Sequence, residues 1–171
     1  MYELKPISRA SIPHALEMAE RYRFLNEPRE AESICRDILR ADPQNQQAIV
    51  IMLLALTDQF TMGVRVNVNH AQELLPRLTD EYHRHYYEGV IHERWAKTQL
   101  EQGVPGYVVF EWFAQAMQSF EKAMAIRPRD NEDAVLRWNT CARIIKRNDE
   151  LRPRPEDRDH AADFHDEVPH R

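Results

Sequence analysis

The chain lacks the features that define several large classes of protein. Only four of its 171 residues are glycine, which suits helices better than a turn-rich β fold. The longest apolar run, AIVIMLLAL at residues 48–56, is far shorter than the roughly 18 residues that span a bilayer. No charged stretch followed by an apolar one opens the chain, so we expect neither a secretory signal nor a membrane-spanning segment.

Cysteine is scarce as well. Cys35 and Cys141 are the two cysteines, and each stands alone within a helical pattern. Isolated residues of this kind are typical of reduced, buried thiols rather than of a disulfide. We therefore expect a cytoplasmic protein with two buried free thiols.

The body of the chain has almost no net charge. Residues 1–147 hold 20 acidic and 19 basic side chains, a net charge of −1, whereas residues 148–171 hold eight acidic side chains and four arginines, a net charge of −4. A near-neutral body lacks the basic surface that nucleic acids require, so we expect no nucleic-acid partner. The acidic segment 148–171 has too few apolar residues to order itself and is predicted to be a flexible tail. One hypothesis is that Phe164 anchors this tail on the basic last helix.

Apolar residues recur at helical spacing through most of the remaining chain, after a lead-in at residues 1–10. Prolines and polar cap residues divide this pattern, with Ser11 as the expected cap of the first helix and Pro76 as a kink or end inside the fourth. The predicted fold class is therefore all-α, with seven helices at about 11–25, 28–41, 46–60, 71–78, 81–102, 107–126 and 131–147.

One spacing occurs twice in this pattern. Ala31-x3-Cys35 is followed by Pro43, and Ala116-x3-Phe120 is followed by Pro128, so each proline lies twelve residues after its alanine. Tyr22 precedes the first alanine by nine residues, and Ala71 marks a middle unit, at intervals of 40 and 45 residues from the other two alanines. The arrangement resembles the tetratricopeptide repeat (TPR), a helical hairpin of 34 residues with the pattern W-x2-L-G-x2-Y…A-x3-F…P.

The resemblance implies a TPR-like α-solenoid of three helical hairpins and a capping helix over residues 11–147. Because the middle unit is imperfect, another α-solenoid or a closed helical bundle remains possible. TPR repeats are generally platforms that bind protein segments in a concave groove, lined by the first helix of each hairpin. The resemblance therefore implies a non-catalytic scaffold that binds a peptide segment of another protein. By resemblance, the groove residues here are Glu20, Phe24, Val50, Asp58, Asn139 and Arg143.

The repeat pattern also makes a steric prediction. Small side chains such as Ala31 and Ala116 let paired helices approach closely, while large ones such as Tyr22 and Phe120 fill the gap to the next turn. Both alanine methyl groups should therefore be buried between helices.

The alternative function is that of a small metal-binding protein or metal-dependent enzyme, with its site in the segment His85 to His92. His85, Glu88 and His92 lie at positions i, i+3 and i+7 of a helix and share one face. Two imidazoles and a carboxylate so placed can bind zinc or iron, but a complete site needs ligands from a facing helix, and no second Glu-x-x-His is present. The favoured interpretation is a surface pair of His85 and Glu88 beside a partly buried His92.

Catalytic motifs are missing. Ser33, Ser119 and Thr140 lie in predicted helices without a strained glycine elbow, and the chain has no phosphate-binding glycine loop and no close pair of cysteines. We therefore expect no enzymatic activity and no cofactor.

The last predicted helix, 131–147, allows two interpretations. Asn139 and Arg143 can hold a peptide backbone or a carboxylate, or the helix can be a solvated cap whose positive end complements the helix dipole. A further possibility is self-association, in which an apolar end of the helical stack pairs with another copy. Trp138 is expected in the core, and an exposed tryptophan would instead anchor a partner.

Overall fold

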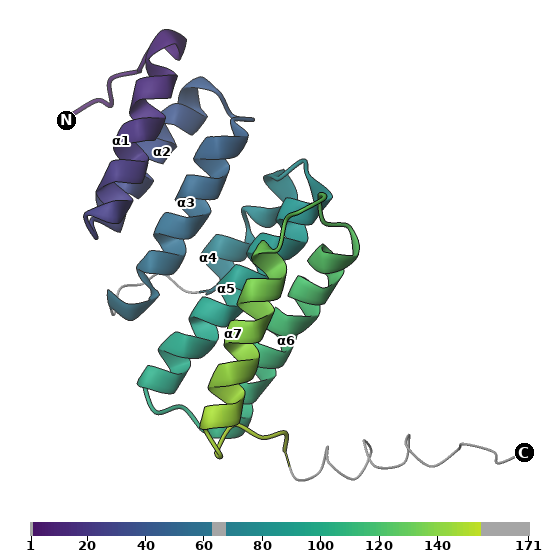
Figure 1. Ribbon diagram of the computed structural model, residues 1–171. Coiled ribbons are helices and arrows are strands. Elements are labelled where there is room, and N and C mark those ends of the chain that lie inside the picture. The colour runs from purple at the N-terminus through teal and green to yellow at the C-terminus, as the bar shows by residue number, and fades with distance from the viewer. Residues whose placement is uncertain (1, 63–67, 155–171) are drawn as a thin grey trace, which may run out of the picture.

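A computed structural model describes residues 2–62 and 68–154, and within these ranges the protein contains helices and no strand (Figure 1). The all-α prediction is confirmed. The helices are α1 (Ile12–Phe24), α2 (Pro28–Ala41), α3 (Gln46–Asp58), α4 (Val68–Gln72), α5 (Glu81–Glu101), α6 (Gly106–Ala125) and α7 (Asp133–Arg147). Short 3-10 turns are η1 (Arg9–Ser11), η2 (Phe60–Met62) and η3 (Leu75–Arg77). No helix in the described ranges combines the length and the apolar character needed to cross a membrane.

Local chemistry accounts for most helix ends. The side chain of Asn45 accepts a hydrogen bond from the Ala48 amide at 3.0 Å, and that of Asp80 accepts one from the His83 amide at 2.8 Å. Each thereby satisfies an amide that has no partner within its helix. The predicted cap at Ser11 is wrong in its chemistry, because the Ser11 hydroxyl donates to the Ser8 carbonyl at 2.7 Å and caps no amide of α1.

The fourth predicted helix is interrupted. Its ordered part, α4, has five residues, and Pro76 lies in the separate 3-10 turn η3. Proline has no amide hydrogen to donate and clashes with the preceding turn, so a single helix cannot run through to Leu78.

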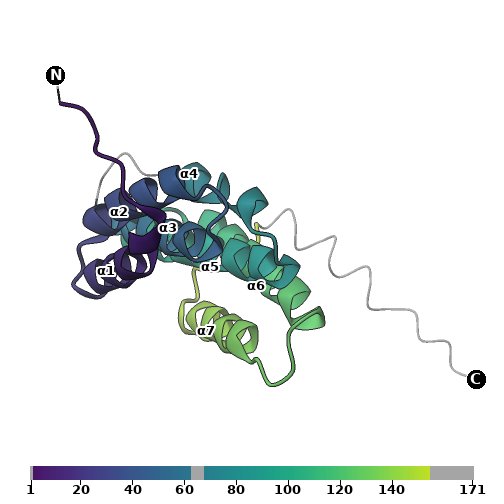
Figure 2. The same ribbon diagram turned by 90° about the horizontal axis from the view of Figure 1, so that it is seen from above.

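The helices pack mainly on their neighbours along the chain. The most extensive contact between helices joins α5 and α6. Further pairs are α1 with α2, α2 with α3, and α6 with α7. Additional contacts join α1 to α3, α3 to α5 and α5 to α7. Figure 2 shows α4 and α7 on opposite sides of the α5–α6 pair.

Small residues lie at the closest contacts between helices. Ala31 and Ala116 have no exposed surface, which confirms their predicted burial, and Ala71 is equally buried. Gly89 of α5 lies beneath the ring of Phe120 of α6, where an added Cβ would come within 2.5 Å of the ring. The absence of a side chain at Gly89 therefore sets the α5–α6 separation.

The folded region extends past α7. Leu151 is completely buried in the core of α5, α6 and α7. Arg154 pairs with Glu111 at 3.3 Å and lies over the ring of Tyr107 at 4.9 Å. The segment predicted as a flexible tail is thus packed as far as Arg154, and its remainder, with Phe164, lies outside the described residues.

Both cysteines are free and buried, as predicted. Burial raises the pKa of Cys35 and of Cys141 to about 12. The thiolate form is therefore nearly absent at neutral pH, and neither thiol is a nucleophile in the folded protein.

Candidate binding surfaces

Three odd-numbered helices meet at a half-buried ion-pair network. Asp58, the last residue of α3, accepts a hydrogen bond from Arg23 of α1 at 2.8 Å and another from Arg94 of α5. Arg94 also donates to the hydroxyl of Thr57 at 2.7 Å. The side chains of Arg23, Asp58 and Arg94 are each between 16% and 25% exposed, so their charges remain within reach of a ligand.

A second carboxylate lies beside this network. Glu93 of α5 is 1% exposed and is paired with Lys97 of the same helix and with Arg137 of α7 at 3.0 Å. Burial opposes the charge on Arg137, but the attraction of the Glu93 carboxylate and the hydrogen bond that Arg137 donates to it outweigh burial, so the pKa of Arg137 is raised. The pair links α5 to α7.

We name these side chains together the charged strip: Arg23, Asp58, Glu93, Arg94, Lys97 and Arg137. It holds four cations and two carboxylates, all at least half buried. Burial lowers the pKa of Arg94; Asp58 opposes that shift, and repulsion from Arg137 and Arg23 adds to it. A cavity of about 350 Å³ opens beside the strip between α1, α3 and α5, with Asn26, Thr98 and the carboxylate of Glu101 also on its wall.

The predicted groove residues are only partly brought together. Asp58 lies in the charged strip, and Glu20 accepts a hydrogen bond from Gln47 of α3 at 3.3 Å. Val50 is half-buried and packs against the core, and Phe24, at the end of α1, is 83% exposed. Asp58 is thus the member of the predicted set that contacts basic side chains.

Asn139 and Arg143 point elsewhere. Arg137 is the residue of α7 that reaches α5, and a helix turns by about 100° per residue. Asn139 and Arg143, two and six residues further, therefore point away from the charged strip. Neither side chain forms a hydrogen bond or ion pair within the described ranges, and their role in binding stays a prediction from the resemblance.

Sequence reasoning missed Arg23, Arg94 and Lys97 as site residues. None of the three belongs to a recognisable motif, so composition does not distinguish it from a solvated side chain. The signal that was available is the spacing of Glu93 and Lys97, an i, i+4 pair on the helix predicted at 81–102.

The His85, Glu88 and His92 set does not converge on a common point. Glu88 accepts a hydrogen bond from Ser119 at 3.1 Å and lies 3.9 Å from His85, whereas His92 is buried against Gln72 and Trp112. Within the described residues, no three His, Cys, Asp or Glu side chains are placed to hold a metal ion. The surface pair and buried histidine favoured on sequence describe this segment better than a metal site.

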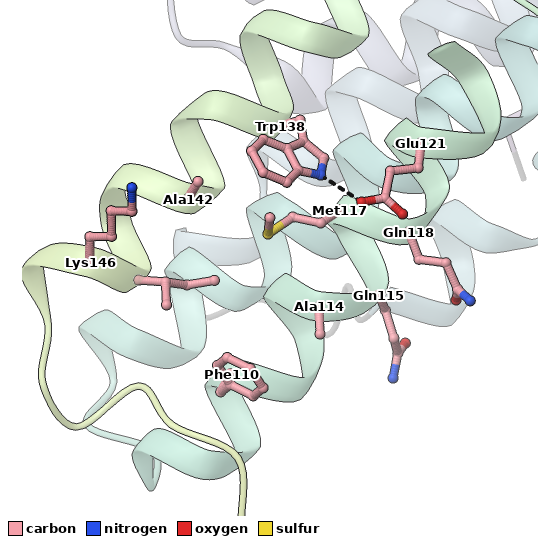
Figure 3. Close-up of a pocket in the computed structure, with 10 residues that line it drawn as sticks. Phe110, Ala114, Gln115, Met117, Gln118, Glu121, Trp138, Ala142 and Lys146 are labelled. Atoms are coloured by element: carbon pink, nitrogen blue, oxygen red, sulfur yellow. Dashed lines mark hydrogen bonds between the residues drawn. The ribbon is translucent and has the colours of Figure 1, made fainter. Parts of the chain in front are cut away.

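A second surface is apolar. A groove of about 730 Å³ runs between α6 and α7. Phe110, Ala114 and Met117 of α6 face Trp138 and Ala142 of α7 across it (Figure 3). Trp138 was expected in the core but is only half-buried, and its indole Nε1 donates to Glu121 at 3.0 Å.

Comparisons with protein-family models, with curated proteins and with solved structures find no match to this chain. The case for a function accordingly depends on these two surfaces and on the arrangement of the helices.

Proposed function

We propose that the protein is a non-catalytic interaction module that binds an acidic, extended segment of another protein along the charged strip. The observation that carries this proposal is the imbalance of charge: four half-buried cations share two carboxylates. Glu101, on the cavity wall, is an exposed and solvated charge that compensates them weakly. Carboxylates of a bound segment would complete the neutralisation.

The state of Arg94 supports an anionic ligand. Its charge is opposed by burial and by two neighbouring arginines. An anion placed in the adjoining cavity would relieve this repulsion, and a hydrogen bond between two charged groups contributes more than a neutral one. The side-chain amide of Asn26 on the cavity wall can bind peptide backbone groups.

The proposal includes a TPR-like stacking of helical hairpins. Contacts between successive helices and between every second helix, together with buried alanines at 31, 71 and 116, support it. In such a stack α1, α3, α5 and α7 share one face, and the members of the charged strip come from these four helices. A long surface built from local contacts is well suited to an extended ligand.

The test is a binding titration with a fluorescein-labelled peptide of Asp and Ser, beside its Asn and Ser analogue. Fluorescence anisotropy should show binding of the acidic peptide only, weakening as salt is raised. The double variant Arg23→Gln, Lys97→Gln should bind about tenfold more weakly, because two charge-assisted contacts are lost.

The matched control is the double variant Lys122→Gln, Arg129→Gln, which removes the same charge from exposed positions outside the strip. Its affinity should equal that of the wild type. Equal losses in both double variants would mean that only net charge matters and would reject the strip as the site. Equal binding of the uncharged peptide would reject the acidic ligand.

A further inference from the structure

The α6–α7 groove is an apolar surface that the proposed function does not use. Its floor and walls come from Phe110, Met117, Trp138 and Ile145, all half-buried, with Ala114 and Ala142 keeping it open. Contiguous apolar surface with a tryptophan at its edge is typical of protein interfaces, since burying an indole contributes strongly to association. The charged residues at the rim of the groove indicate which partner covers the groove.

The rim has opposite charges at its two ends. Glu121 lies beside Trp138 at one end (Figure 3). Lys146 lies at the other end, two helical turns or about 12 Å along α7 from Trp138. The side chains of Glu121 and Lys146 are exposed. One oxygen of the Glu121 carboxylate accepts from Trp138, so the other can accept a further hydrogen bond.

Such a rim is complementary to itself. A two-fold axis midway between Glu121 and Lys146 places the lysine of one copy over the glutamate of the other, and the reverse pair follows by symmetry. A partner with a single positive or negative face would meet one favourable and one unfavourable end.

The charge near the groove also permits pairing. Residues 1–147, which include the groove, carry −1 of the chain's net charge of −5, so the surfaces that meet repel each other only weakly. Leu151 and Arg154 pack on α6 near its beginning, beside the groove rather than over it, so described residues leave the groove open.

We propose that the α6–α7 groove binds the same groove of a second copy of this chain, with α7 of each protomer lying in the groove of the other and Lys146 paired with Glu121 across the two-fold axis. Trp138, Met117 and Ile145 form the apolar centre of this interface. The charged strip lies on the side of α7 that faces α5, so the dimer presents two strips.

The experiment is a charge exchange read by sedimentation equilibrium. Each single variant, Lys146→Glu or Glu121→Lys, brings like charges together at both ends and should weaken the homodimer about tenfold. An equimolar mixture of the two variants restores both pairs in the heterodimer. With one variant fluorescently labelled, the heterodimer should form with an affinity close to that of the wild type.

Lys122→Glu is the matched control, since it makes the same charge change on α6 outside the groove and should leave the dimer unchanged. Thermal melts of every variant test that it is folded. A wild type that stays monomeric up to about 100 μM, where a dimer of micromolar affinity would predominate, overturns the proposal. A dimer that both single variants form as readily as the wild type overturns the assigned surface, as does failure of the mixture to associate more strongly than either variant alone.

Discussion

His92 is a buried titratable group whose surroundings disfavour a charge. It is 6% exposed, and the Nε2 atom of Gln72 donates to its Nε2 at 3.0 Å, so the neutral ring carries its proton on Nδ1. Nδ1 is enclosed and makes no well-formed hydrogen bond within the described residues. Burial lowers the pKa of His92 below its ordinary 6.5, although Glu88 and the backbone of Gln115 partly oppose the shift.

The direction of that shift sets a pH dependence. Below about pH 6.5 the unfolded chain protonates this histidine while the folded protein does not, so the free energy of unfolding should fall as the pH falls, until the folded pKa is reached. Urea unfolding measures this pH dependence in the wild type and in His92→Gln. The titrations run from about pH 5 to pH 8, roughly the range in which histidine titrates. In His92→Gln the free energy of unfolding should change less steeply with pH than in the wild type. The control His14→Gln, at an exposed position, should keep the slope of the wild type. Identical slopes in all three proteins would show that His92 titrates normally.

At the scale of elements, the contact between α5 and α6 depends on a missing side chain. Gly89 lies under Phe120, which is fully buried, so the ring cannot move aside without displacing its own neighbours. The helical propensity of alanine would favour Gly89→Ala by about 1 kcal/mol. The steric cost of overpacking is larger in a dense interior.

We therefore expect Gly89→Ala to lower the free energy of unfolding by about 1–3 kcal/mol despite its better helix propensity. Chemical denaturation monitored by circular dichroism measures this. The double variant Gly89→Ala, Phe120→Leu, which makes space for the methyl group, should recover part of the loss relative to Phe120→Leu alone. A stabilised Gly89→Ala protein would show that α5 and α6 are less tightly packed than described.

At the scale of the whole molecule, the fold is completed by residues beyond the last helix. Leu151 is fully buried against the helices it follows. Gly106, at the start of α6, lets the backbone of Glu150 lie directly against α6, because an added Cβ at Gly106 would come within 2.2 Å of the Glu150 carbonyl oxygen. The folded unit therefore extends past the end of α7 and includes Leu151.

Two truncated chains test the boundary. A chain ending at residue 154 should unfold with nearly the same free energy as the full chain, because Leu151 and Arg154 are retained. A chain ending at residue 147 should lose about 2–3 kcal/mol, the contribution of a buried leucine side chain. Leu151→Ala in the full chain should reproduce most of that loss. Equal stability of both truncated chains would contradict the packing of the segment.

Sequence reasoning predicted the all-α class, most helix bounds, the free buried cysteines and the burial of Ala31 and Ala116. These features depend on local periodicity, on proline and cap chemistry, and on side-chain size, all of which can be read from neighbouring residues. The expected end or kink of the fourth helix at Pro76 is confirmed by its place in the separate turn η3. The Ser11 cap failed because the Ser11 hydroxyl donates to Ser8 instead.

The charged strip, the apolar groove and the packing of Leu151 were decided by tertiary structure alone. Asp58 and Arg94, or Glu93 and Arg137, are separated by more than 30 residues in the chain, and the pairing of their charges depends on how the helices rotate and pack. Helical periodicity shows which face of a helix is apolar, but not which partner covers it. The helices follow from local sequence, whereas the surfaces available to a ligand follow from their packing.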